Sequence, residues 1–421
     1  MKSGLNFLVA AKRCEIAELQ QLALTSALVN VSARLVHGLQ RERGLSNIYL
    51  GSQGTRFAEA RAQQIDDCRR IEAELRACFD TLDTDSARPG HGARLFSRIA
   101  YVLHGLDALP ALRQQVDALH WSARQATEAY VRLIAGLLAV VFEAADSAGD
   151  PEISRLLVAL FNFMQGKEFA GQERAAGSAL LATGRAETSE QQRLLHLIES
   201  QERCLQVFTE FSSPEVGALW AQTLASAPLA ELERMRRILG TAAHDAPLDA
   251  SQCQAWFDCC SLRIDGMKAV EDRLAQDLQR VCEEKITAAR GDLQACLALS
   301  APTAAAGDPL SFFRDTPAPP GGNAGTGLAV PAHGYGPQLE RSILELVQAQ
   351  ARRLQAMGDE LDTVRASLNE RKLIERAKGL LMAHRQLSEE DAHKTMRQMA
   401  MNQNRRLIEV AEAVLAMAAV L

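Results

Sequence analysis

The chain has 421 residues, of which 47% are hydrophobic, 23% are charged and 5% are aromatic. This length allows two or three domains, and the scarcity of aromatic residues and β-branched runs favours an all-α fold over a β-sandwich. The net charge of −6 argues against non-specific polyanion binding by the whole molecule. The apolar runs near the N-terminus are shorter than a signal-peptide core or a membrane span, so we expect a cytoplasmic protein that does not enter a membrane.

Residues 1–300 contain long helical patterns separated by polar or proline-containing breaks, and they show no strand-like alternation. Long segments of this kind favour a helical bundle. The nine cysteines lack the paired cluster of a zinc site, so we expect reduced thiols and no bound metal. We therefore predict an all-α, helical-bundle domain over residues 1–300.

An arginine lies on the apolar face of a predicted helix in the stretch LQRERGLSNIYLGSQG. The residues around Arg43 follow the three- and four-residue steps of a core-facing stripe, which consists of Val36, Leu39, Ser46 and Leu50. A guanidinium does not lose its charge in a protein, so a buried arginine needs a carboxylate, water or a bound anion.

Two further arginines have the same spacing. Arg174, in QGKEFAGQERAAGSALL, follows Gly171 on a three-four track, and Arg236, in PLAELERMRRILG, lies between Leu232 and Leu239. Small residues let the helices approach closely and leave room beside the first two guanidiniums: Gly44, Ser46, Gly171, Ala175 and Ser178.

Two interpretations of these arginines remain open. In the first, each arginine pairs with a glutamate of the same bundle, and the candidates are Glu42, Glu168, Glu173 and Glu233. In the second, Arg43, Arg174 and Arg236 converge on one small anion, in a pocket that lacks acidic counter-ions. Arginine suits a planar oxyanion because its flat fork donates parallel hydrogen bonds, whereas lysine is a point charge. We adopt the second interpretation as our hypothesis.

A linker interrupts the helical pattern at residues 301–337, which hold seven of the thirteen prolines and seven glycines. A segment of this composition does not bury enough apolar surface to offset its ordering entropy. We therefore predict a flexible connection between two domains.

A coiled coil is predicted over residues 338–370. Its seam follows steps of four and three across nearly four heptads and consists of Ile343, Val347, Gln350, Leu354, Met357, Leu361, Val364 and Leu368. Pairing of this seam with a second copy of the chain predicts a homodimer, in which the polar Gln350 helps to fix the register.

Residues 371–421 are predicted to form a compact three-helix unit with a basic surface. Residues 365–421 carry ten Lys or Arg and seven Asp or Glu, whereas the rest of the chain is acidic. Arg371, Lys378 and Arg385 are seven residues apart, so they share one helix face. This surface is either a solvated helix face or an RNA-binding surface, to which the further contributors are Lys372, Arg376, His393, Lys394, Arg397, Arg405 and Arg406.

Three segments of the first domain resemble the nitrate- and nitrite-sensing NIT domain: LVHGLQRERGLSNIYLGSQG, QGKEFAGQERAAGSALL and WFDCCSLRIDGMKAVEDRLAQDL. The resemblance implies an all-helical sensor whose arginines clamp nitrate or nitrite between helices. Helical phase selects the three ligands, and the resemblance supplies the identity of the anion. The ligands are Arg43, Arg174 and Arg236, and the alternatives in a shifted register are Arg41, Arg234 and Arg237.

The tail IERAKGLLMAHRQLSEEDAHKTMRQMAM resembles the ANTAR module, a small RNA-binding antiterminator domain. This resemblance favours RNA over a solvated basic face. It implies contact with the loops of two leader-transcript hairpins, which excludes the terminator hairpin. His393 stands where this family often has a tyrosine, so a base stacked at this position would lie on an imidazole.

Together, the two resemblances imply a nitrate-responsive antitermination regulator. We hypothesise that the sensor holds the RNA-binding unit away from RNA and that anion binding releases it. The alternative is an anion-sensing signalling protein that acts on a protein partner. The sequence contains no recognisable Gly-rich phosphate loop, metal-ligand cluster or nucleophile motif, so we expect neither an enzyme nor a cofactor other than the effector anion.

Overall fold

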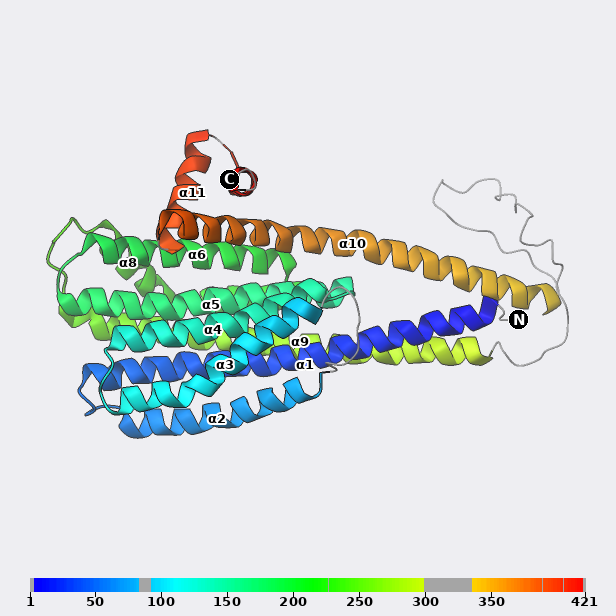
Figure 1. Ribbon diagram of the computed structural model, residues 1–421, viewed down its shortest axis with the longest axis horizontal. Helices are drawn as coiled ribbons and strands as arrows, with labels where there is room; N and C mark the ends of the chain where they lie inside the picture. The colour runs from blue at the N-terminus through cyan, green and yellow to red at the C-terminus, as the bar shows by residue number, and fades with distance from the viewer. Residues whose placement is uncertain are drawn as a thin grey trace.

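The computed structural model describes residues 4–82, 92–225, 227–298, 335–387, 389–403 and 405–418 (Figure 1). These residues form twelve α-helices and one short 3-10 helix, η1 (Ala250–Gln252), which confirms the all-α fold. The α-helices are α1 (Gly4–Gly51), α2 (Ala58–Asp80), α3 (Gly92–Asp117), α4 (Ala123–Ser147), α5 (Pro151–Thr183), α6 (Thr188–Phe211), α7 (Pro214–Leu224), α8 (Ala227–Thr241), α9 (Cys253–Ala298), α10 (Tyr335–Arg385), α11 (Glu389–Gln403) and α12 (Leu407–Ala418).

Local sequence sets the start and the end of α5, a central helix of the bundle formed by residues 4–298, which is named the sensor here after the resemblance given above. The side chain of Asp150 accepts hydrogen bonds from the backbone N–H groups of Glu152 and Ile153, each at 3.1 Å, and so caps the helix. Pro151 occupies the first turn, where no backbone donor is needed. Gly184 ends the helix with a φ of 68°, a left-handed conformation that favours glycine.

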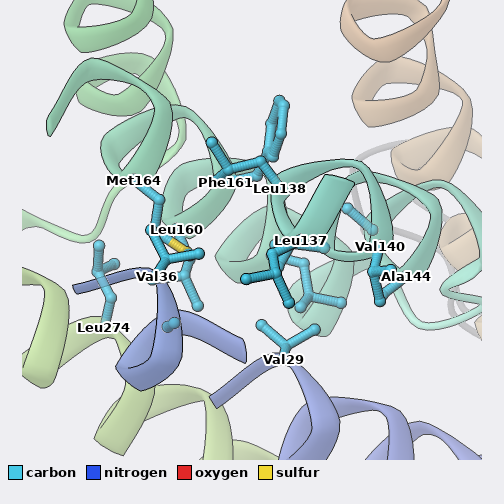
Figure 2. Packing of buried hydrophobic residues seen from close by; sticks show 14 of the residues in the cluster. Val29, Val36, Leu137, Leu138, Val140, Ala144, Leu160, Phe161, Met164 and Leu274 are labelled. Carbon is cyan, nitrogen blue, oxygen red and sulfur yellow. The ribbon is translucent and has the colours of Figure 1, made fainter. Parts of the chain in front are cut away.

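The helices of residues 4–298 pack into one elongated bundle (Figure 1). Helix α1 packs against α2, α4 and α9, and α5 packs against α4, α6 and α9. Helices α7 and α8 pack on α9. Figure 2 shows part of the apolar core that these helices share, with Val36 of α1, Leu137 of α4, Leu160 of α5 and Leu274 of α9.

Helix α1 is long and apolar enough to cross a membrane between Asn6 and Gly51, which the sequence analysis did not anticipate. However, 56% of its most apolar window is buried inside the protein. Leu28, Leu35 and Leu39 are completely buried among the other helices. A helix at the centre of a bundle is hydrophobic for this reason, so its composition is that of a core helix.

Helix α10 runs without interruption from the predicted coiled coil into the basic unit. Leu361, Val364 and Leu368 are buried, and the last two belong to the core of the sensor. This part of the seam therefore packs on the same chain, whereas Leu354 is 56% exposed. The side chains of Ile343, Val347 and Gln350 lie outside the described residues, as do residues 301–334 of the predicted linker.

The last part of α10 forms a small core with α11 and α12, which confirms the predicted three-helix unit. Ala377, Met396, Val410 and Ala411 are at the centre of this core. The unit lies at the end of α10 that is next to α6 (Figure 1). Four basic residues of α10 and α11 thereby contact the sensor: Arg371, Lys372, Lys394 and Arg397.

Candidate anion site and RNA-binding surface

Two of the three predicted arginines meet between α1 and α5. Arg43 is only 3% exposed, and Arg174 is half-buried. Each guanidinium lies against a glycine of the opposite helix. A Cβ atom added at Gly171 would be 2.8 Å from Nη2 of Arg43, and one added at Gly44 would be 3.1 Å from Nη2 of Arg174. The small residues do leave the room for the guanidiniums that the sequence predicted.

Arg43 forms a bidentate ion pair with Glu168 of α5. Its Nη1 donates to Oε1 at 2.5 Å and its Nη2 donates to Oε2 at 3.1 Å. The side-chain amides of Gln40 and Gln172 also donate to this carboxylate, each at 2.9 Å. The expectation of a pocket without acidic counter-ions is therefore wrong at Arg43, because a buried guanidinium is stabilised by a carboxylate at hydrogen-bond distance.

Arg174 differs from Arg43 because it forms no ion pair with any of the described residues. Its Nη1 donates to Oγ of Ser261 at 2.9 Å, and its guanidinium lies 4.8 Å from the centre of the Phe257 ring. Burial and the nearby charge of Arg43 lower the pKa of Arg174. The charges of Asp265 and Glu168 act on Arg174 in the opposite sense. Glu168 is the one carboxylate that forms an ion pair with either guanidinium among the described residues, so the ion-paired groups of the site have an excess of positive charge.

Arg236 lies in a neighbouring cluster with acidic partners of its own. Its Nε and Nη2 donate to the two oxygens of Glu173, both at 2.6 Å, and its Nη1 donates to Glu233 at 2.6 Å. Burial opposes the charge of Arg236, but these carboxylates raise its pKa overall. The pairing interpretation holds for this residue too, and its contact with a bound anion remains a prediction. The shifted-register alternatives are all exposed: Arg41, Arg234 and Arg237.

Sequence reasoning missed a further buried arginine cluster, which lies between α1, α2, α3 and α4. Arg113 donates to both oxygens of Glu42 at 2.9 Å and to Glu72 at 2.7 Å. Arg61 pairs with Asp117 and donates to Ser46, and it is only 2% exposed. The spacing that found Arg43 was present here, since Arg113 follows Leu106 and Leu109 and precedes Val116 in steps of three and four.

The sensor holds several of the predicted RNA-binding residues of α10. Nη1 of Arg371 donates to Oδ1 of Asn162 at 3.2 Å, and its guanidinium lies 4.6 Å from the centre of the Phe161 ring. The ammonium of Lys372 pairs with Asp146 at the end of α4. Both side chains therefore point to the sensor and not to solvent.

Residues of α11 dock on α6 in the same way. Nη1 of Arg203 donates to Nε2 of His393 at 2.8 Å, so this nitrogen is unprotonated. Burial and the charge of Arg203 lower the pKa of His393 to about 3. Nζ of Lys394 donates to Gln192 at 3.5 Å, and Arg397 pairs with Glu199. His393 is 5% exposed, so its ring is covered in this arrangement.

The other predicted residues of this surface differ in burial. Lys378 is 8% exposed and pairs with Glu375 of its own helix at 2.8 Å. Four residues are exposed: Arg376, Arg385, Arg405 and Arg406. The structure thus places part of the predicted RNA-binding set against the sensor and leaves these four residues open to solvent.

The fold and the two sites define a class of protein: a helical sensor with a buried arginine pair that carries a basic three-helix unit on its surface. Family models match both parts of the chain. Residues 34–279 match the NIT family, described as nitrate and nitrite sensing, and residues 362–415 match the ANTAR domain. The chain belongs to the NIT family and ends in an ANTAR domain, whose match begins within α10 and before the predicted boundary at residue 371.

Comparison with individual proteins agrees with this assignment. The chain is 32% identical over 407 residues to the nitrate regulatory protein of Klebsiella oxytoca, which covers 96% of this chain and 93% of the relative. The solved structure of the NasR transcription antiterminator superposes with a TM-score of 0.60 and 31% identity, over 99% of each chain. The family is therefore that of the nitrate-responsive antitermination regulators, as the two sequence resemblances implied.

Proposed function

We propose that nitrate or nitrite binds between Arg43 and Arg174 and that this binding releases the ANTAR unit to bind RNA. The observation that carries the proposal is a pair of close guanidiniums of which only Arg43 has an ion-pair partner, Glu168, among the described residues. A planar monoanion accepts parallel hydrogen bonds from such forks and removes the repulsion between them. Arg236, with its own carboxylates, is proposed to act as a third ligand only where those partners rearrange.

Helix α5 links the anion site to the docked unit. It carries Glu168 and Arg174 at the anion site, and about two turns before Glu168 it carries Phe161 and Asn162, which hold Arg371. A small shift of α5 on anion binding therefore changes both places, because packed helices move as rigid elements. The anion must bind the released arrangement better than the docked one for this coupling to operate.

The docked arrangement competes directly with RNA. Asp146 and Glu199 pair with Lys372 and Arg397, cations that would otherwise be available to phosphates. Loops of a leader-transcript hairpin are the proposed RNA partner, since unpaired bases are what side chains read in RNA. We further propose that the protein acts in the cytoplasm as a homodimer through the seam of α10, and as a regulator without catalytic activity.

The affinity of the full chain for a two-hairpin leader RNA, measured with increasing sodium nitrate, tests this proposal. Sodium chloride at equal ionic strength is the control, because RNA binding by basic proteins weakens with salt. We expect nitrate to tighten RNA binding by roughly 5- to 150-fold, the usual range of an allosteric coupling. An RNA dissociation constant that nitrate leaves unchanged would contradict the proposal, and together with retained nitrate binding it would favour a protein partner.

A further inference from the structure

Glu168 occupies the face of Arg43 that a planar oxyanion would take. The two carboxylate oxygens accept from Nη1 and Nη2 of Arg43 at 2.5 and 3.1 Å. A carboxylate is flat and carries one negative charge, as nitrate and nitrite do, and it binds a guanidinium fork in the same bidentate way. We infer that Glu168 is an internal competitor of the effector and so determines the anion affinity of the site, an inference that rests on the proposed anion site.

Only one planar anion at a time binds both Nη groups of Arg43. Nη2 of Arg43 lies against Gly171, where even a Cβ atom would be 2.8 Å away. Arg43 is 3% exposed, so its guanidinium is enclosed by the protein on all sides. An effector that takes both N–H groups of the fork must displace the carboxylate from them.

The carboxylate has other donors that remain when it leaves Arg43. Gln40 donates to Oε2 and Gln172 donates to Oε1, each at 2.9 Å. These two amides reduce the cost of releasing Glu168, because a buried carboxylate without any donor is strongly disfavoured. The exchange therefore replaces one planar anion with another on Arg43 and leaves Glu168 hydrogen-bonded.

The cluster of Arg61 and Arg113 offers a matched control at Glu42. This residue also accepts two hydrogen bonds from one arginine, from Nε and Nη2 of Arg113, each at 2.9 Å. Arg113 has a second carboxylate, Glu72, at 2.7 Å, and Arg61 pairs with Asp117. Removal of the charge of Glu42 therefore leaves each guanidinium with a carboxylate and is not expected to create a stronger anion site.

The test is calorimetric titration of sodium nitrate and sodium nitrite into the full chain, with sodium chloride as the reference salt. We compare the wild type with Glu168→Gln, Glu168→Asp and Glu42→Gln. The amide of Glu168→Gln keeps the size of the side chain and loses its charge, and we expect anion binding about ten- to a hundredfold tighter. Glu168→Asp withdraws the carboxylate by one methylene and should tighten binding several-fold, whereas Glu42→Gln should bind anions as the wild type does.

The melting temperature gives a second readout. Glu168→Gln should melt lower than the wild type in chloride, because two guanidiniums are then unpaired, and should recover more than the wild type does in nitrate. A merely structural glutamate would lower the melting temperature equally in both salts. The inference would be overturned if the wild type binds nitrate and the folded variants Glu168→Gln and Glu168→Asp bind it equally or more weakly. The anion site itself would then still stand. Absence of anion binding by every variant would reject the anion site itself, and the inference with it.

Discussion

Two arginine pairs of the sensor differ in their balance of charge. Arg61 and Arg113 form ion pairs with three carboxylates, those of Glu42, Glu72 and Asp117. Arg43 and Arg174, by contrast, form an ion pair with only one carboxylate among the described residues, that of Glu168. Burial of an arginine on a helix face therefore does not by itself mark a binding site. The cluster in which guanidiniums outnumber carboxylates is the one that a monoanion completes, and the other cluster holds α1, α2 and α3 together.

The largest effect is expected at Arg113. The substitution Arg113→Met removes the cation that pairs with Glu42 and Glu72 and leaves their charges buried. We expect the free energy of unfolding to fall by about 3–5 kcal/mol, the usual cost of breaking a buried ion pair. Urea denaturation measures this loss. A decrease below about 1 kcal/mol would show that the carboxylates are easily resolvated and that this cluster does not hold the helices together.

The substitution Arg174→Met shows most clearly how the roles of the two clusters differ. No carboxylate is left unpaired by this change, because Arg174 bonds to Ser261 and lies over Phe257. We expect the stability in chloride to be unchanged or higher, while nitrate affinity falls by about ten- to a hundredfold. Urea denaturation and nitrate titration of the same preparation check both outcomes. A loss of stability as large as that of Arg113→Met would contradict the difference between the clusters.

Helical spacing predicted which arginines face the core, but it did not predict their partners. Arg43 and Arg236 are buried as their phase required, and the register alternatives are exposed. The glutamates considered as partners do bind buried arginines, although Glu42 binds Arg113 and not Arg43. The choice between partners depends on how the helices rotate and slide against one another, which a single sequence does not encode locally.

The sequence supported the docking of the ANTAR unit on the sensor only as a hypothesis. The pattern of α10 indicated a seam, and three of its residues are buried as the pattern required. The sequence did not show that Val364 and Leu368 pack on their own sensor, since an apolar seam fits any apolar partner. For the same reason, a basic residue such as Arg397 has the same periodicity whether Glu199 or a phosphate faces it.

The docked interface gives a smaller expected effect. The double variant Asp146→Asn and Glu199→Gln removes the carboxylates that hold Lys372 and Arg397. We expect RNA binding in chloride to become about five- to tenfold tighter, since each partly exposed ion pair contributes up to about 1 kcal/mol. The matched control is Glu128→Gln with Glu231→Gln, which removes two charges whose partners lie on the same helix. Equal RNA binding by both double variants would contradict a docking role.

The smallest expected effect is the pH dependence of docking. Docking lowers the pKa of His393 to about 3, among Arg203, His196, Lys378 and Arg397. In the released unit, His393 has a pKa near its ordinary value of about 6.5, so it takes up a proton at a higher pH than the docked residue does. Docking is therefore strongest above about pH 6.5 and weakens as the pH falls toward about 3. RNA affinity in chloride should therefore rise roughly fourfold from pH 8 to pH 6. His393→Gln should abolish this change, and an identical pH profile in the variant would reject the assignment.

Calorimetric titration of nitrate into the wild type and Arg174→Met tests the central claim most directly, because Arg174 is the guanidinium of the site that forms no ion pair with the described residues. We predict one nitrate per chain in the wild type and at least a tenfold loss of affinity in the variant. Equal affinities in the two proteins, or no binding by the wild type, would contradict the claim that the excess charge of Arg43 and Arg174 forms the anion site.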